Sequence, residues 1–149
     1  MRSEAMEQLD VLVGSWRSTL SNAWFLEPAD LEVPGTGTGQ WLSDAFVDFR
    51  WTMQGDVGAA TSEQVLVLGR SDAQESFVTL YHDERGVCRV FATTFGDGQW
   101  TMLREDSDMF QRFVADVGPD RIEGRWEASQ DQGVTWRKDF DLTFDRERT

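Results

Sequence analysis

Residues 120–146 contain two runs in which apolar and polar side chains alternate, separated by the turn sequence Gln-Asp-Gln-Gly. The apolar side chains share one face of each run: Ile122, Gly124, Trp126 and Ala128 in the first, and Trp136, Phe140, Leu142 and Phe144 in the second. Because successive side chains of a β-strand point to opposite faces, this pattern is typical of a long, half-buried antiparallel hairpin. The end of the chain therefore requires a sheet with one covered face.

The same alternation recurs along most of the chain, and turn sequences such as those at 83–86 and 96–98 separate the runs. After an opening strand at Gly14, the predicted strands are 39–45, 46–54, 62–69, 75–83, 87–95, 98–104, 109–117, 120–129 and 134–145. A sheet of about ten hairpin-linked strands has two open edges, which closure into a barrel removes. We therefore expect residues 1–149 to form one all-β domain, a single antiparallel up-and-down barrel; a two-sheet sandwich is the alternative.

Two segments near the start of the chain break the alternation. Residues 4–12 carry apolar side chains at helical spacing, and Ser3 is suited to cap a short helix there. Residues 21–39 contain two prolines and the sequence Gly-Thr-Gly-Thr-Gly, which favour a long irregular loop. Trp24 and Phe25 indicate that part of this loop packs down over the barrel, as a mouth or lid.

The charge of the chain narrows the classes of partner. It has 27 acidic and 14 basic residues and a net charge of −13, and such a surface repels the phosphates of nucleic acids and anionic membranes. No apolar stretch reaches the length of a membrane-spanning helix, and the acidic N-terminus does not resemble a signal peptide. Cys88 is the single cysteine, which excludes an internal disulfide and a multi-cysteine zinc site. We expect a cytoplasmic protein that binds neither nucleic acid nor membrane.

The two ends of the chain resemble those of lipocalin-like barrels. Gly14 and Trp16 match the Gly-x-Trp opening of lipocalins, in which the tryptophan closes one barrel end and an arginine of the last strand packs on it. Arg146 matches that arginine, and a guanidinium stacks favourably on an indole. More narrowly, residues 9–16 and 126–140 resemble the paired terminal motifs of a bacterial lipocalin-like family of unknown function. The resemblance implies a barrel with a cavity and supplies no reaction.

Nitrobindin-type haem barrels are similar in layout, but two of their features are absent from this sequence. Residues 17–24 replace their glycine-rich continuation after the first tryptophan. Their haem-ligating histidine lies late in the chain, whereas this chain has no histidine after His82. Haem is therefore not expected, and no cofactor or metal site is predicted.

The turn between the last two strands carries a second pattern. Ser129, Asp131, Gly133 and Trp136 resemble the Asp-box turn of sialidase-type propellers. In such a turn the Ser and Asp oxygens satisfy turn amides, and the glycine supplies a positive φ. Because one copy cannot build a propeller, we predict a structural role for these residues.

Two side chains that occur only once are candidate ligand contacts. His82 shares a strand face with Val78 and Leu80 and can point into the barrel as a general base or metal ligand; the alternative is a hydrogen-bonded histidine at a strand end. By parity, Lys138 falls on the face of Trp136, where it would suit a carboxylate or phosphate. Fatty-acid-binding barrels are similar in using an interior cation. The alternative is a lysine that extends to the rim of the barrel or pairs with an acid.

Arginines and aromatic residues complete the candidate set. Arg50 shares a face with Asp48, whereas Arg89 and Arg112 share faces with apolar neighbours. Each arginine can lie inside the barrel or form a salt bridge outside it, because a ligand-binding barrel mixes polar and apolar residues on its inner face. The aromatic residues can either line a cavity or pack a filled core: Trp24, Trp41, Trp51, Trp100, Trp126, Trp136, Phe49, Phe91 and Phe95.

These observations favour a protein that holds a small hydrophobic or amphipathic molecule in its barrel. The predicted ligand contacts are His82, Lys138, Trp24, Trp51, Trp100, Trp136 and Arg112. One alternative is a small barrel enzyme with His82 or an interior carboxylate as base, which requires a perturbed pKa in a cleft. The other is an interaction protein with a filled core, including a homodimer formed through an aromatic outer face.

Overall fold

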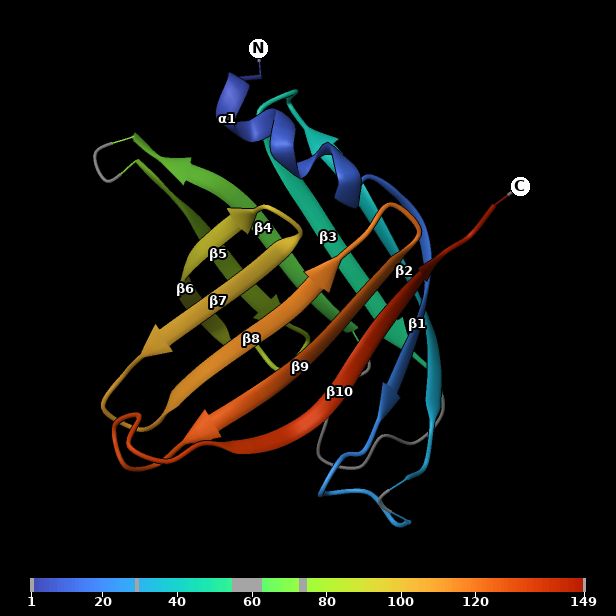
Figure 1. The fold of residues 1–149 in the computed structure, drawn as a ribbon, viewed down its shortest axis with the longest axis vertical. Coiled ribbons are helices and arrows are strands. Elements are labelled where there is room, and N and C mark those ends of the chain that lie inside the picture. Colours follow the sequence, from blue (N-terminus) through green and yellow to red (C-terminus); the bar gives the residue numbers. More distant parts are fainter. Residues whose placement is uncertain (1, 29, 55–62, 73–74, 149) are drawn as a thin grey trace.

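The computed structural model describes residues 2–28, 30–54, 63–72 and 75–148. The elements in chain order are α1 (Glu4–Glu7), the 3₁₀ segment η1 (Gln8–Leu12), β1 (Gly14–Ser21), β2 (Val33–Leu42), β3 (Phe46–Met53), β4 (Glu63–Ser71), β5 (Ser76–Asp83), β6 (Cys88–Gly96), β7 (Gln99–Glu105), β8 (Phe110–Val117), β9 (Arg121–Ser129) and β10 (Arg137–Arg146). Within the described residues, the ten strands form one closed antiparallel barrel (Figure 1). Each strand pairs with its neighbours in the chain, and β1 pairs with β10. The predicted all-β barrel is confirmed, and the sandwich alternative is wrong.

The N-terminal helical segment covers one end of this barrel (Figure 1). The Ser3 side chain accepts a hydrogen bond from the Met6 amide at 3.3 Å and so caps α1. Leu9 and Leu12 of η1 are fully buried, and the Leu12 carbonyl accepts a hydrogen bond from Trp16 Nε1 at 3.0 Å. These contacts close the end at which β1 begins. In the part of the chain that the structure describes, no helix has the length and hydropathy to cross a membrane.

Arg146 joins this closed end to the last strand. Its guanidinium lies 4.1 Å from the centroid of the Trp16 ring. It also donates hydrogen bonds to the carbonyls of Val13 at 2.7 Å and Val11 at 2.6 Å. Gly14 has a φ of +135°, and a side chain there would collide with the Arg146 guanidinium. The glycine, the indole and the guanidinium therefore form one packed unit.

The prediction of one long loop over residues 21–39 is wrong in its second half, because β2 begins at Val33. Gly35, Gly37 and Gly39 occupy the inward positions of this strand, and the threonines between them face outward. A Cβ at Gly39 would collide with the backbone of Leu12. The absence of side chains thus lets the helical segment and the neighbouring strand approach β2 closely, which is a packing reason for glycine in a strand.

Aromatic side chains fill the closed half of the barrel. Phe49 packs edge-to-face on Trp100 at 5.8 Å and on Phe144 at 5.1 Å, measured between ring centroids. Trp100 in turn packs on Phe113 at 5.0 Å. All four rings are almost inaccessible to solvent. This half of the barrel is therefore a solid core, and any internal space must lie toward the other end.

Candidate functional site

The end of the barrel opposite α1 contains a cavity of about 250 Å³. It lies where β3, β5 and β9 end and where β4, β6, β8 and β10 begin. Its lining residues are Phe25, Trp51, Gln64, Tyr81, Arg85, Arg89, Phe91, Met109, Gln111, Trp126, Asp139 and Phe140. Ligand pockets generally measure roughly 300–1,000 Å³, and this cavity of about 250 Å³ lies just below that range, so it suits a small ligand.

Aromatic residues make up half of the cavity lining. Phe91 packs edge-to-face on Trp126 at 5.6 Å, and Tyr81 packs on Phe91 at 6.4 Å. Trp126 also contacts Phe113 of the filled half at 5.1 Å. The floor of the cavity is therefore the side of the aromatic core that faces the open end, and ring packing fixes the positions of the floor residues.

The segment after β1 covers the mouth of the cavity through Phe25 rather than through Trp24. Phe25 packs edge-to-face on Phe140 at 6.0 Å, and both rings line the cavity. Trp24 is 58% exposed, and its Nε1 donates a hydrogen bond to Asp139 Oδ1 at 3.0 Å. The Arg137 guanidinium lies 4.5 Å from the Trp24 ring. Trp24 thus anchors the segment from outside and is not a cavity residue.

Asp83 is a buried carboxylate at the cavity margin with partners from its own hairpin. Its Oδ2 accepts hydrogen bonds from the Tyr81 hydroxyl at 2.7 Å and from Arg85 Nη2 at 2.7 Å. The Arg85 amide donates to Oδ1 at 2.9 Å. Burial alone would raise the pKa of Asp83, but the hydrogen bonds from Arg85 and Tyr81 outweigh it and lower the pKa to about 2. Asp83 is therefore ionised and is a poor base.

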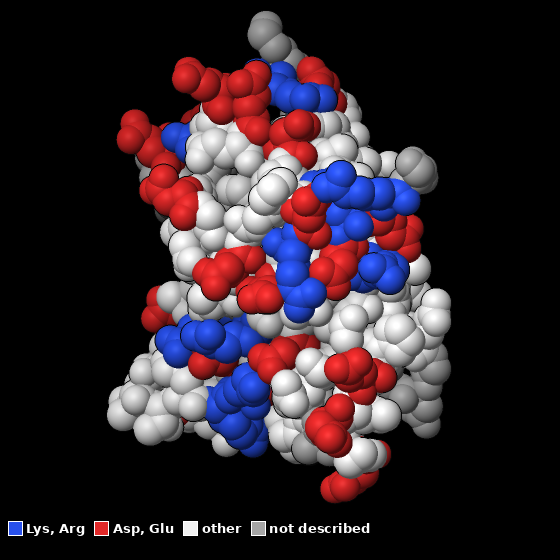
Figure 2. Space-filling view, turned by 45° about the vertical axis from the view of Figure 1, so that its right-hand side comes forward, with Lys and Arg blue, Asp and Glu red and all other residues white. Residues whose placement is uncertain are grey.

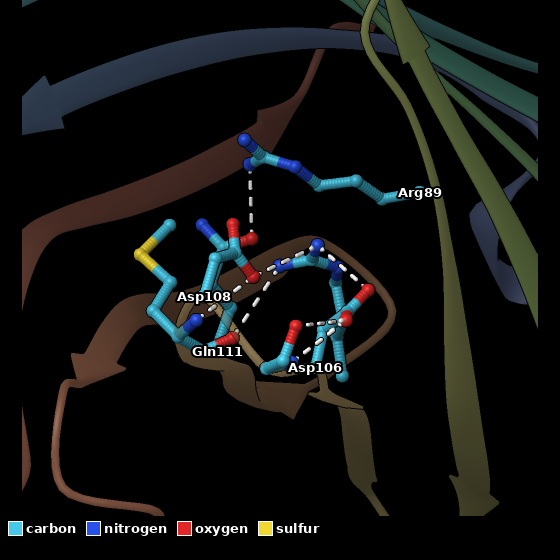
Figure 3. Close-up of polar contacts among 7 residues, drawn as sticks. Arg89, Asp106, Asp108 and Gln111 are labelled. Atoms are coloured by element: carbon cyan, nitrogen blue, oxygen red, sulfur yellow. Dashed lines mark hydrogen bonds and ion pairs between the residues drawn. The ribbon is translucent and has the colours of Figure 1, made fainter.

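Arg89 lines the cavity from the inner face of β6, which it shares with Phe91 two residues further along. Its Nη1 donates a hydrogen bond to Gln111 Oε1 at 2.9 Å (Figure 3). Of the three arginines that the sequence leaves open, this one points inward. Arg50 lies outside, where it holds Asp48 through two hydrogen bonds of 2.9 and 2.6 Å.

His82 faces solvent, contrary to the expectation that it points into the barrel. The inward positions of β5 belong to Phe77, Thr79, Tyr81 and Asp83. Polar Thr79 is accommodated inside because its hydroxyl pairs with that of Thr93 at 2.7 Å. Apolar Val78 and Leu80 lie outside, so apolar residues occupy both faces of this strand and do not identify its inner face.

Lys138 also lies outside the barrel, contrary to the parity argument. A β-bulge between Lys138 and Phe140 adds one residue to β10 and reverses the alternation. Phe140 therefore faces the cavity, and the exposed Lys138 ammonium pairs with Asp141 at 3.1 Å. Pairing with an acid is the alternative that the sequence left open for Lys138.

Arg112 and Trp136 contact each other on the outer surface rather than in the cavity. The Arg112 guanidinium lies 3.9 Å from the Trp136 ring and donates to Glu127 Oε1 at 2.8 Å. Hydrogen bonding to Arg112 lowers the pKa of Glu127 below its ordinary value, although burial opposes the shift. Basic and acidic side chains also lie next to each other elsewhere on the surface: Figure 2 shows Lys and Arg side chains among Asp and Glu side chains across one face.

Of the tryptophans predicted to contact a ligand, Trp51 lines the cavity and Trp100 lies in the filled half. The Nε1 atoms of both are buried, and neither has a hydrogen-bond partner among the described residues. Both indoles therefore act as apolar packing surfaces. Sequence reasoning missed Gln111 and Arg85 as cavity residues, because neither forms a motif and only the folded barrel brings them together.

The turn after β9 is held by side-chain hydrogen bonds. Ser129 Oγ donates to Asp131 Oδ1 at 2.7 Å and accepts from the Gly133 amide at 2.9 Å. Asp131 Oδ1 also accepts from the Thr135 amide at 2.8 Å, and Gly133 has a φ of +85°. Hydrogen bonds from Thr135 and Ser129 lower the pKa of Asp131 to about 2. Every partner belongs to the turn itself, and none faces the cavity.

The described residues contain no group of three His, Cys, Asp or Glu side chains arranged to hold a metal ion. The residues that line the cavity offer aromatic surfaces, one methionine, two arginines, two side-chain amides and the Asp139 carboxylate.

Comparison with known proteins gives a fold and no family. No protein-family model matches the chain, and no match is found among curated proteins. The solved "Crystal Structure of Rv2717c from M. tuberculosis" is similar, with a TM-score of 0.67 and 10% sequence identity over 99% of this chain and 100% of that one. At this identity the likeness shows the fold alone.

Proposed function

We propose that this protein binds a small, largely apolar molecule non-covalently in the cavity at the open end of its barrel. One observation carries the proposal: the closed half is packed solid, whereas the open half leaves about 250 Å³ between aromatic walls. A barrel that needed only a core could fill both halves in the same way. A concave pocket with aromatic walls and a few convergent polar groups is typical of ligand sites.

The arrangement favours binding over catalysis. Phe91 and Trp126 provide a floor on which an apolar group loses contact with water, and each buried methylene contributes about 0.8 kcal/mol. Phe25 and Phe140 form the cover. Asp83 is held ionised by its partners, and His82 lies outside, so neither of these two candidates is suited to act as a base in the cavity.

The terminal motifs support a narrower assignment. We propose that the chain is a divergent member of the bacterial lipocalin-like family whose terminal motifs it resembles. The contact between Arg146 and Trp16 at the closed end supports this proposal.

A probe titration with a cavity-filling variant tests the proposed function. The neutral dye N-phenyl-1-naphthylamine should bind the wild type with stoichiometry near one, gaining emission by energy transfer from nearby indoles. Met109→Trp should weaken binding at least about tenfold, because the larger side chain occupies the cavity. Val134→Trp is the matched control, since Val134 is 80% exposed and does not line the cavity.

Native mass spectrometry of the same samples should show one dye per chain for the wild type and for Val134→Trp. Absence of dye uptake by the wild type would refute the proposal. Equal uptake by both variants would show that the dye binds elsewhere, and would refute it as well.

A further inference from the structure

The basic side chains at the open end differ in their partners. Arg85 is neutralised by Asp83 at 2.7 Å. Arg104, in the neighbouring hairpin, is held by Asp106 at 3.0 Å and by Asp108 at 3.2 Å (Figure 3). In both cases the chain supplies the counter-charge.

Arg89 lacks such a partner. Among the described residues no carboxylate lies within ion-pair distance of its guanidinium, and its hydrogen bond goes to the neutral Gln111. Gln111 is itself nine-tenths buried and lines the cavity, so this contact orients the guanidinium without cancelling its charge. A guanidinium has five N–H donors, which leaves it the capacity to bind a further acceptor.

The missing counter-charge is notable because the chain is strongly acidic. With 27 acidic residues against 14 basic ones, a carboxylate opposite an inward arginine is readily available, and Arg85, Arg104 and Arg137 at this end each have one. A half-buried cation without a counter-ion carries a desolvation cost that a bound anion relieves. The unpaired charge on the cavity wall therefore indicates an anionic ligand.

Asp139 limits where that anion can lie. It also lines the cavity, but it belongs to β10, and β7, β8 and β9 separate it from Arg89 around the barrel. Its carboxylate accepts from Trp24 and lies 3.8 Å from Arg137. The cavity thus has an unpaired cation on the β6 side and, on the β10 side, a carboxylate that already has Trp24 and Arg137 as partners, so a single anionic group is expected to bind on the β6 side.

We infer that the cavity selects a monocarboxylate with a compact apolar body, whose carboxylate binds Arg89 while the body lies against Phe91 and Trp126. This inference rests on the proposed function and adds the chemical class of the ligand. Arginine is suited to this role, because its planar fork matches the two oxygens of a carboxylate.

Paired ligands that differ only in the head group test the inference. Decanoate and decanol, each below its aggregation concentration, compete with the neutral dye at neutral pH. The wild type should bind decanoate at least about tenfold more tightly than decanol, as expected for one charge-assisted contact. Arg89→Gln should abolish this preference and leave the affinity for decanol unchanged, which also shows that the variant is folded.

Arg125→Gln is the matched control, because it removes the same charge from an exposed position on the outer face of β9. It should keep the wild-type preference. The carboxylate inference would be overturned if the wild type bound decanoate and decanol with equal affinity. It would also be overturned if Arg89→Gln weakened the binding of both ligands equally. In either case the cavity proposal would still stand. If the wild type binds neither ligand nor the dye, the proposed function itself fails, and the inference fails with it.

Discussion

Asp83, at the margin of the cavity, and Arg89, which lines it, differ in whether the chain neutralises their charges. Asp83 is held by Tyr81 and Arg85, so its charge belongs to the structure of the wall. Arg89 has a neutral partner, so its charge is available to a ligand. The sequence places Arg89 and Phe91 on one face of a strand, but it does not say that this face is the inner one.

The Asp83 hydrogen bonds lead to a pH-dependent prediction. Asp83→Asn should lower the free energy of unfolding near neutral pH by about 1–2 kcal/mol, because it removes a charge-assisted interaction with Arg85. The folded state lowers the pKa of Asp83 from 3.8 to about 2. The carboxylate therefore stabilises the wild type above about pH 4, and this contribution is lost as the pH falls toward about 2.

Urea unfolding at a series of pH values measures this effect. The difference between the wild type and Asp83→Asn should narrow through the acid range, whereas Glu105→Gln, at an exposed position, should differ little from the wild type throughout. A difference that stays constant into strong acid would show that the charge of Asp83 is not the cause.

At the scale of elements, β2 and β10 depart from what their sequences predict. The Gly-Thr-Gly-Thr-Gly run reads as a loop because glycine lacks a strand preference, yet it forms β2 because inward glycines admit the backbone of Leu12 and the neighbouring strand. The bulge before Phe140 has no local signal, because a bulge depends on the pairing with β9. Both departures arise from partners distant in the sequence.

The close approach at β2 predicts which face of the strand tolerates a methyl group. Gly39→Ala should lower the free energy of unfolding by about 1–3 kcal/mol, because the added Cβ collides with the Leu12 backbone, which cannot move as a flexible side chain would. Thr38→Ala, on the exposed face of the same strand, should change it by less than about 0.5 kcal/mol. Chemical denaturation of the two variants compares them directly, and similar losses would contradict the packing argument.

The molecule as a whole is a barrel with one closed and one open end, and Arg146 links the closed end to the last strand. Its guanidinium bonds to carbonyls of the segment that leads into β1, while it stacks on Trp16. The terminal motifs predict this stacking pair, since each motif is a short local pattern. The hydrogen bonds to Val11 and Val13 could not be predicted, because they depend on how the helical segment crosses the barrel end.

Arg146→Ala should therefore loosen the closed end. We expect a loss of about 2–4 kcal/mol in the free energy of unfolding, from two charge-assisted hydrogen bonds to the carbonyls of Val11 and Val13 and one cation–π contact. Hydrogen exchange should show reduced protection of residues 9–16. Arg148→Ala, at a side chain 76% exposed, serves as the control, and equal effects of the two variants would refute this role for Arg146.

The sequence by itself determined the antiparallel barrel class and most of the strands, because period-two alternation and turn residues are local properties of the chain. Tertiary structure decided which face of each strand is inner. Alternation defines faces only relative to each other, and one bulged residue reverses them, as it does for Lys138. Tertiary structure also decided that one half of the barrel is filled and the other half is hollow. That difference depends on the summed volumes of side chains such as Phe49 and Trp126, which meet only when distant strands close the sheet.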